Sequence, residues 1–175
     1  ATSQAVVRIE VTPSATIDIG VYYDVDRDRI FDRYEPGIPN VAVAITSPTN
    51  RRFTGRTSDG GGAQFTQLTE LGRYAVTIDA ASLPRNYAPS VIQDHVTVTE
   101  TQQTATYIGY KGPDDADADQ DEIPDHVEGA DDADGDGIPN YLDKDSDNDE
   151  RLDIDEGYPA SIDPGRKLYL PTIAR

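Results

Sequence analysis

Apolar and polar residues alternate along most of the chain between positions 5 and 110. In the run 5–12, Val7, Ile9 and Val11 fall on one side of an extended strand and polar residues on the other. This period of two is typical of a strand with one buried face. Runs rich in β-branched and aromatic residues predict further strands at 16–23, 41–46, 64–68, 73–79, 95–99 and 104–110.

Turn-forming residues separate these runs, and no segment repeats apolar residues with the period of a helix. The turns are expected at 36–37, 47–48, 59–62, 71–72 and 83–84. The expected fold is therefore all-β: an Ig-like or prealbumin-like antiparallel β-sandwich of about seven strands, in which helices are short or absent.

Aspartate replaces the alternating pattern between residues 113 and 157, where few large apolar side chains remain. Because such a stretch cannot build an ordinary core, we expect a domain boundary near residue 112. Pro171 would confine a last strand to a sheet edge, since proline cannot donate a ladder hydrogen bond. The predicted segments are an N-terminal extra strand at 1–14, the sandwich at 15–111, a loop-rich repeat segment at 112–158 and a C-terminal strand at 159–175.

The formal net charge of −18 disfavours a nucleic-acid partner, because phosphate binding needs a basic face and the arginine pair at 51–52 is too short to form one. Cysteine is absent and zinc would depend on His95 and His126, so a zinc site is not expected. No apolar run approaches the roughly 20 residues of a transmembrane helix. The small, polar run 1–3 is typical of the end left by signal-peptide removal and predicts an extracellular or cell-surface location.

The aspartates follow a spacing that suits a hard cation. Calcium takes six to eight oxygens, and a loop of about 12 residues supplies them from positions 1, 3, 5, 7, 9 and 12, with position 7 using its backbone carbonyl. Four segments match this template, so we expect about four bound calcium ions. The predicted ligands are Asp24, Asp26, Asp28, Ile30, Asp32 and Glu35 in the first loop; Asp117, Asp119, Asp121, Ile123, Asp125 and Glu128 in the second; Asp132, Asp134, Asp136, Ile138, Asn140 and Asp143 in the third; and Asp145, Asp147, Asp149, Arg151, Asp153 and Glu156 in the fourth.

A solvated acidic tail is the alternative interpretation, but a random tail would not repeat the complete spacing. Nor would it place Ile123, Ile138 and Leu152 so regularly, where we expect small apolar contacts between neighbouring loops. Without calcium the crowded carboxylates would repel one another. Folding of this segment should therefore depend on the ion.

Position 6 of each loop makes a sharp turn that favours glycine, and only Gly137 complies. Arg29, Glu122 and Glu150 occupy this position in the other loops, which we expect to bind more weakly or to turn differently. No amphipathic helices flank the loops, so structural calcium is favoured over a sensor that opens a groove. Extracellular calcium sites of this kind have affinities of roughly 0.1 to 1 mM.

Several sequence runs carry a resemblance to a known domain: GVYYDVDRDRIFDRYEPGIPNVAV at 20–43, TSDG at 57–60, GRYAV at 72–76 and IGY at 108–110. With these runs, residues 19–110 resemble the B-type repeat domains of bacterial surface adhesins of the collagen-adhesin and serine-aspartate-repeat families. The resemblance implies a sandwich that serves as a stalk unit, often with calcium in its first aspartate loop. Some members form a Lys-Asn cross-link, which is not expected here because no lysine precedes Lys111.

The runs DGDGIPN at 134–140 and DSDND at 145–149 carry a second resemblance. Residues 114–157 look like thrombospondin type 3 repeats. In that family the chain wraps around lines of calcium ions, which implies a stiff rod with an ionic core. Both resemblances imply surface architecture, and no arrangement typical of catalysis accompanies them: the carboxylates are assigned to ions, and His95 and His126 are expected to be surface or supporting residues. We therefore do not expect an enzyme.

Two structural functions remain open. In the first, a terminal strand completes the sheet of a neighbouring copy, so that the protein self-associates into a filament whose joints calcium rigidifies. In the second, the chain is a monomeric stalk or adhesin module that binds a host protein or polysaccharide. For such a ligand the sequence offers only scattered tyrosines, which suit a core, an interface or a sugar-binding surface equally well. They include Tyr22, Tyr23, Tyr34, Tyr87 and Tyr141.

Overall fold

The structure, a computed structural model, describes residues 14–91, 93–99 and 103–156. The strands expected at 5–12 and within 159–175 lie outside the described residues. The chain divides into two compact units, which we call the sandwich unit and the loop unit. Among described residues, the sandwich unit holds 14–21, 37–83, 93–99 and 103–108, and the loop unit holds 22–36, 84–91 and 109–156.

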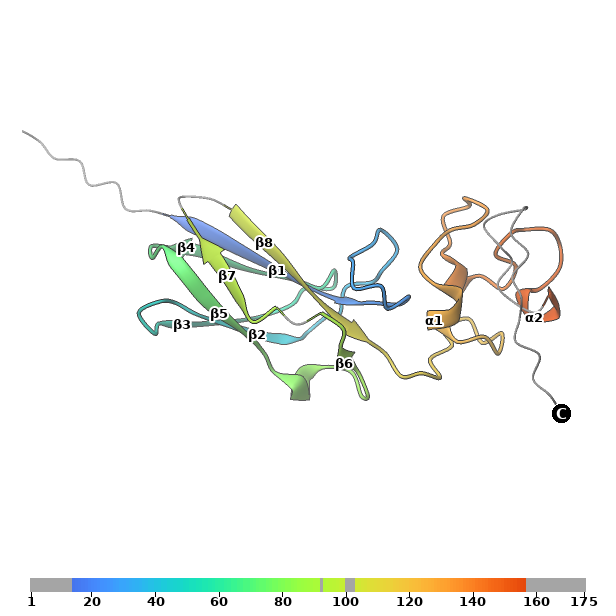
Figure 1. Ribbon diagram of the computed structural model, residues 1–175, viewed down its shortest axis with the longest axis horizontal. Helices are drawn as coiled ribbons and strands as arrows, with labels where there is room; N and C mark the ends of the chain where they lie inside the picture. Colours follow the sequence, from blue (N-terminus) through green and yellow to red (C-terminus); the bar gives the residue numbers. More distant parts are fainter. Residues whose placement is uncertain (1–13, 92, 100–102, 157–175) are drawn as a thin grey trace, which may run out of the picture. The chain divides into compact units, whose positions relative to one another are not determined.

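Two four-stranded sheets contain the described strands (Figure 1). The first sheet has the order β4-β1-β8-β6, formed by Gly62–Leu68, Ala15–Tyr23, Gln103–Lys111 and Ala88–Pro89. The second has the order β3-β2-β5-β7, formed by Arg52–Arg56, Ala42–Thr46, Gly72–Ile78 and His95–Val98. The pairings β1/β4, β2/β3, β2/β5, β5/β7 and β6/β8 are antiparallel. These sheets confirm the all-β class expected from the alternating pattern.

Alternation along the strands creates the core of the sandwich unit. On β1, Ile17 and Ile19 are fully buried and their neighbours are partly exposed, as a half-buried strand requires. Ile45 of β2 is also fully buried, and Tyr74 of β5 is nearly so. Burying a side chain of this size stabilises a fold by about 1.5 to 3 kcal/mol, so these positions supply much of the stability of the sandwich unit.

The sequence did not predict two of the described strands. The other described strands agree with the prediction to within two residues at each end. The first, β3, is an edge strand in which Arg52, Thr54 and Arg56 are exposed, so it carries almost no apolar signal. It exists because its backbone pairs with β2. The second, β6, is only two residues long and contains Pro89, which would not be assigned to a strand from its composition.

A glycine-rich crossing connects β3 in one sheet to β4 in the other. Gly61 has a φ of +75°, and a Cβ built there would lie 2.3 Å from the carbonyl oxygen of Val21. A Cβ on Gly37 would lie 2.2 Å from the carbonyl oxygen of Gly60. Because only glycine tolerates such close backbone approaches, these residues fix where the chain changes sheets.

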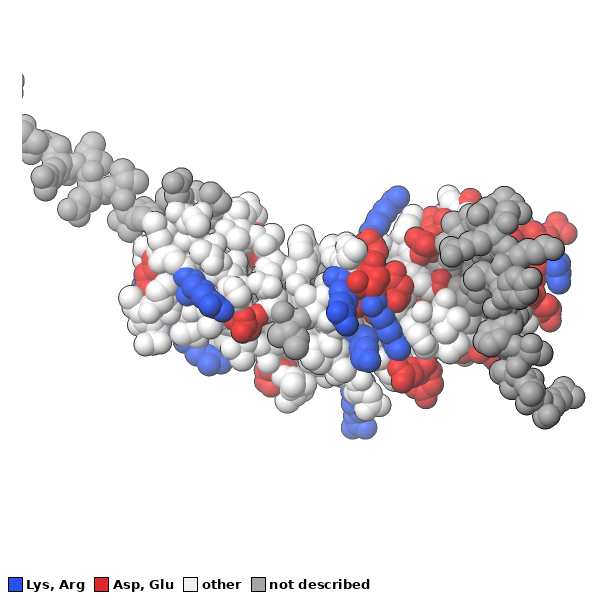
Figure 2. All heavy atoms as spheres, viewed as in Figure 1, with Lys and Arg blue, Asp and Glu red and all other residues white. Residues whose placement is uncertain are grey.

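Short helical turns are the only helices in the described part of the chain, in agreement with the sequence prediction. They are the 3-10 turns η1 (Ala80–Ser82) and η2 (Asn140–Leu142) and the single α-turns α1 (Asp125–Glu128) and α2 (Asp153–Glu156). None of the helices described here is long and apolar enough to cross a membrane. In the face drawn in Figure 2, Asp and Glu side chains gather over the loop unit.

Candidate metal sites

The four aspartate loops share one backbone conformation, which begins with the carboxylate at position 1. In each loop this carboxylate accepts a hydrogen bond from the backbone N–H at position 6. The four N···O distances are 3.4 Å for Arg29 to Asp24, 3.2 Å for Glu122 to Asp117, 3.2 Å for Gly137 to Asp132 and 3.1 Å for Glu150 to Asp145. The loops therefore curl around their first carboxylate.

The carboxylate at position 5 holds the next part of each curl, because it accepts the N–H of position 7. The distances are 2.6 Å for Asp28, 2.8 Å for Asp121, 2.7 Å for Asp136 and 2.9 Å for Asp149. In the first three loops, position 3 likewise accepts the N–H of position 5. Within the described residues, the carboxylates at positions 3 and 5 accept these hydrogen bonds through one oxygen, which leaves the second oxygen able to bind another partner.

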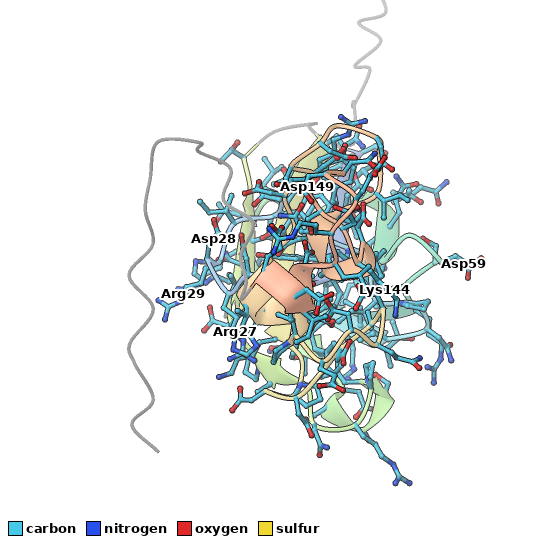
Figure 3. All side chains as sticks on the ribbon, turned by 90° about the vertical axis from the view of Figure 1, so that its right-hand side faces the viewer. Arg27, Asp28, Arg29, Asp59, Lys144 and Asp149 are labelled. Atoms are coloured by element: carbon cyan, nitrogen blue, oxygen red, sulfur yellow. The ribbon has the colours of Figure 1, made fainter. Side chains whose placement is uncertain are left out.

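Left-handed backbone at positions 4 and 6 completes the shared conformation. At position 6, φ is +72° for Arg29, +80° for Glu122, +99° for Gly137 and +74° for Glu150. Of the two consequences expected for the loops without glycine, the different turn is therefore not found: they make the same turn at some steric cost. Weaker binding stays a prediction. Arg29 points outward from the described part of the chain in Figure 3.

Position 9 closes each tandem loop. Its N–H donates to the carbonyl before position 1, at 2.8 Å for Asp125, 2.7 Å for Asn140 and 2.9 Å for Asp153. Its side-chain oxygen accepts the N–H of position 2, at 2.7, 3.0 and 3.1 Å in the same order. These residues were predicted as ligands, and the structure shows in addition that they act as clamps, which is why Asn140 can replace aspartate in the third loop.

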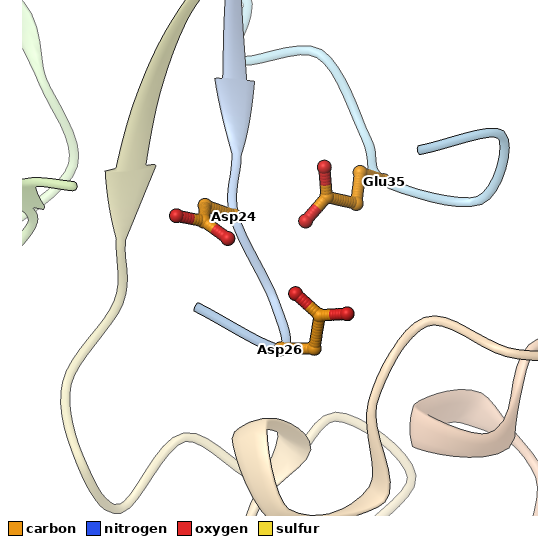
Figure 4. Close-up of side chains that lie close together, drawn as sticks. All are labelled: Asp24, Asp26 and Glu35. Carbon is orange, nitrogen blue, oxygen red and sulfur yellow. The ribbon is translucent and has the colours of Figure 1, made fainter. Parts of the chain in front are cut away.

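The first loop is closed differently, by Glu35 at position 12. Its Oε1 accepts the N–H of Val25 at 2.9 Å, and its Oε2 accepts the N–H of Asp32 at 3.0 Å. Asp24, Asp26 and Glu35 each direct a carboxylate oxygen into a common space, in which these oxygens lie within 4.8 Å of one another (Figure 4). That spacing suits a shared cation.

Further groups of predicted ligands converge within the same distance. They are Asp26, Asp28 and Asp32; Asp117, Asp119 and Asp121; Asp132, Asp134 and Asp136; and Asp121, Glu128 and Asp153. The last group combines residues from the second and fourth loops, which the loop-by-loop template did not anticipate. In the fourth loop, Glu156 at position 12 accepts a 2.7 Å hydrogen bond from Arg151, so part of its carboxylate already has a cationic partner.

Burial and mutual repulsion disfavour charge on several of these carboxylates. Burial is the main cause that raises the pKa of Glu35 to about 8, and repulsion from Asp24 and Asp26 adds to it, while the hydrogen bonds that Glu35 accepts from backbone N–H groups act in the opposite direction. Burial and the nearby aspartates raise the pKa of Glu128 to about 9 and that of Asp119 to about 6. A bound cation would remove this repulsion and restore the ionised forms.

Some buried carboxylate oxygens have no hydrogen-bond partner among the described residues. They are Oδ2 of Asp24, Asp119 and Asp121 and both oxygens of Glu128. Asp24 is fully buried, and Glu128 is only 5% exposed. Because an unpaired buried carboxylate is costly, these atoms point to a partner of positive charge.

Tyrosines connect the first loop to the tandem loops inside the loop unit. Tyr23 donates to Oδ2 of Asp125 at 3.0 Å, and Tyr34 donates to Oδ2 of Asp132 at 2.7 Å. The hydroxyl of Tyr141 donates to the carbonyl of Tyr34 at 3.3 Å, and burial raises the pKa of Tyr141 to about 12. The sequence leaves core, interface and sugar-binding roles open for these tyrosines, because nothing in their spacing reveals an aspartate partner.

The three apolar residues expected to make small contacts between loops differ in burial. Ile123 is buried, whereas Ile138 is 45% exposed and Leu152 is 47% exposed. Ile138 and Leu152 can therefore contribute only about half of their side chains to such contacts. Hydrogen bonds to carboxylates hold the third and fourth loops, and the burial of Tyr141 adds to them in the third.

No family model and no curated protein matches this chain. Similar solved structures include the TIE protein of Bacillus anthracis, which is 20% identical over 57% of this chain and 17% of that chain, with a TM-score of 0.42. The minor pilin GBS52 of Streptococcus agalactiae is 12% identical over 59% of this chain and 46% of its own, with a TM-score of 0.44. The shaft pilin spaA from Lactobacillus rhamnosus GG is 12% identical over 55% of this chain and 49% of its own, with a TM-score of 0.42. The match thus spans less than half the length of each of these chains.

Proposed function

We propose that this protein is a calcium-binding structural module of an extracellular or cell-surface assembly. The observation that carries the proposal is the set of buried carboxylate oxygens without partners, above all those of Asp24 and Glu128. They lie in loops whose backbone already has the curled conformation that presents several oxygens to one ion.

The donor set favours calcium over other cations. Only oxygen atoms converge in these groups, and neither cysteine nor histidine takes part in them, so a zinc-type site is disfavoured. Calcium accepts a large and irregular number of oxygens, whereas magnesium demands near-octahedral geometry. The proposal agrees with the calcium-bearing loops implied by the resemblance to B-type and thrombospondin type 3 repeats.

Equilibrium dialysis against calcium, with magnesium as the competing ion, tests this proposal. We expect uptake of several calcium ions per chain, about four, with affinities of roughly 0.1 to 1 mM. Millimolar magnesium should displace few of them. Absence of calcium uptake at millimolar concentration would exclude the proposed function.

The proposal includes self-association into a filament. Each sheet ends, among the described strands, in outer strands: β4 and β6 in one sheet and β3 and β7 in the other. An outer strand can accept an extended segment from a neighbouring copy. The alternating run 5–12 and the apolar run 167–173 have the composition of such donors.

Sedimentation in millimolar calcium and after EGTA, with electron microscopy of the fast fraction, tests the filament. We expect calcium-dependent polymers, and we expect deletion of residues 1–12 to leave a folded monomer. Polymers that persist after this deletion would eliminate the run 5–12 as the donor. A monomer under all conditions would favour the stalk or adhesin alternative.

A further inference from the structure

Three buried carboxylates from two different loops meet inside the loop unit. Asp121 is position 5 of the second loop, Glu128 is its position 12, and Asp153 is position 9 of the fourth loop. One oxygen from each lies within 4.8 Å of the others. Their exposed fractions are 7%, 5% and 0%, so water cannot screen the repulsion between them.

The hydrogen-bond pattern around these carboxylates leaves oxygens unpaired. Both oxygens of Glu128 and Oδ2 of Asp121 are buried without a hydrogen-bond partner. None of the ion pairs found in the described ranges involves the three residues. Protonation of Glu128 would reduce the charge, but its new O–H would still need an acceptor. A cation in contact with all three groups would offset their negative charge. It would also give the unpaired oxygens a partner.

We infer that Asp121, Glu128 and Asp153 bind one divalent, oxygen-preferring cation that joins the second loop to the fourth. This inference rests on the proposed function and adds a site in which the ion links two loops instead of filling one. The third loop lies between them in the chain. An ion at this point would therefore make the three tandem loops fold as one unit.

Asp153 also has a structural role, which the test must separate from ion binding. Its carboxylate accepts the N–H of Ser146 at 3.1 Å and the hydroxyl of Ser146 at 2.6 Å. In the third loop, Asn140 fulfils the corresponding role, because its amide oxygen accepts the N–H of Ala133 at 3.0 Å. Asp153→Asn should therefore keep the clamp and remove only the negative charge.

Calcium titration calorimetry of the full chain, on matched variants, tests the inference. We expect Asp153→Asn to weaken one calcium site at least tenfold, and Glu128→Gln to weaken the same site even if Asp153→Asn does not fold. Asp155→Asn removes one charge from an exposed neighbour in α2 and should leave all affinities within about twofold. Ser146→Ala removes the clamping hydroxyl without changing charge and should preserve the number of ions bound.

The outcomes separate this inference from the proposed function. A wild-type chain that binds no calcium would overturn both. A wild-type chain that binds calcium, with Asp153→Asn and Glu128→Gln both titrating like Asp155→Asn, would overturn the inter-loop site alone. Equal losses in Asp153→Asn and Ser146→Ala would assign Asp153 to the clamp and not to the ion.

Discussion

The two units of this protein are stabilised by different interactions. In the sandwich unit, residues such as Ile17 and Ile45 are fully buried, and strand pairing satisfies the backbone. In the loop unit, carboxylates accept backbone N–H groups along each curl, while Ile138 and Leu152 remain nearly half exposed. Apolar burial needs no ion, whereas crowded carboxylates repel one another unless a cation lies between them. We therefore expect removal of calcium to affect the loop unit and to leave the sandwich unit unchanged.

The largest expected effect comes from truncating the core of the sandwich unit. Ile45→Ala removes a fully buried side chain and should destabilise this unit by about 3 kcal/mol. Ile138→Ala is the matched change in the loop unit and should cost less than about 1 kcal/mol, because its side chain is 45% exposed. Urea unfolding followed with and without calcium measures both. If calcium restored the loss in Ile45→Ala, the two units would not be stabilised separately.

The second largest effect per residue on stability should come from a change of pH, which acts on the loop unit. In calcium-free protein, Glu35 and Glu128 have a pKa of about 8 and about 9 when folded, well above the ordinary value of 4.5. The folded state then holds protons that the unfolded state releases, so this contribution to stability is complete below about pH 4.5 and is lost as pH rises through 8 to 9. Between pH 5 and pH 7 each of these two groups should lower the stability of the calcium-free loop unit by roughly 2 kcal/mol.

Calcium should cancel this pH dependence, because the ion binds the deprotonated carboxylates. Thermal unfolding at several pH values, in EGTA and in millimolar calcium, measures the effect. Glu128→Gln is the control. Its neutral amide does not titrate, so the calcium-free variant should show a weaker pH dependence of stability. A calcium-free loop unit that becomes more stable as pH rises from 5 to 7 would contradict the assignment.

The smallest expected effect concerns position 6 of the loops. Glu150→Gly should stabilise the loop unit by about 1 kcal/mol, because glycine adopts the φ of +74° without strain. Gly137→Ala should cost a similar amount at a φ of +99°. Calcium affinity and melting temperature measured on both variants test this pair. A weaker calcium affinity in Glu150→Gly would show that the glutamate itself contributes to binding.

The sequence predicted the parts of the structure that follow a simple period. Alternation located β1, β2, β4, β5, β7 and β8, and the aspartate spacing located the four loops that curl alike. Neither period could predict β3, because an edge strand with three exposed polar residues owes its structure to its partner strand. The turn at Glu122 and Glu150 was also missed, because glycine preference is a statistical tendency that hydrogen bonds to Asp117 and Asp145 override.

The spacing of aspartates along the chain could not predict contacts between separate loops. The group formed by Asp121, Glu128 and Asp153 depends on how the second and fourth loops fold together, which a loop-by-loop template does not contain. The same holds for the hydrogen bonds from Tyr23 to Asp125 and from Tyr34 to Asp132. Such pairs are specified by tertiary structure, which brings together residues that are far apart in the chain.

Hydrogen exchange read by mass spectrometry, in millimolar calcium and in EGTA, tests most directly whether an ion holds the loop unit. We predict that backbone amides in 24–35 and 117–156 lose protection when calcium is removed, while amides of β2 and β5 keep theirs. Equal protection of the loops in calcium and in EGTA would contradict the account, because the curled loops would then be stable without a cation.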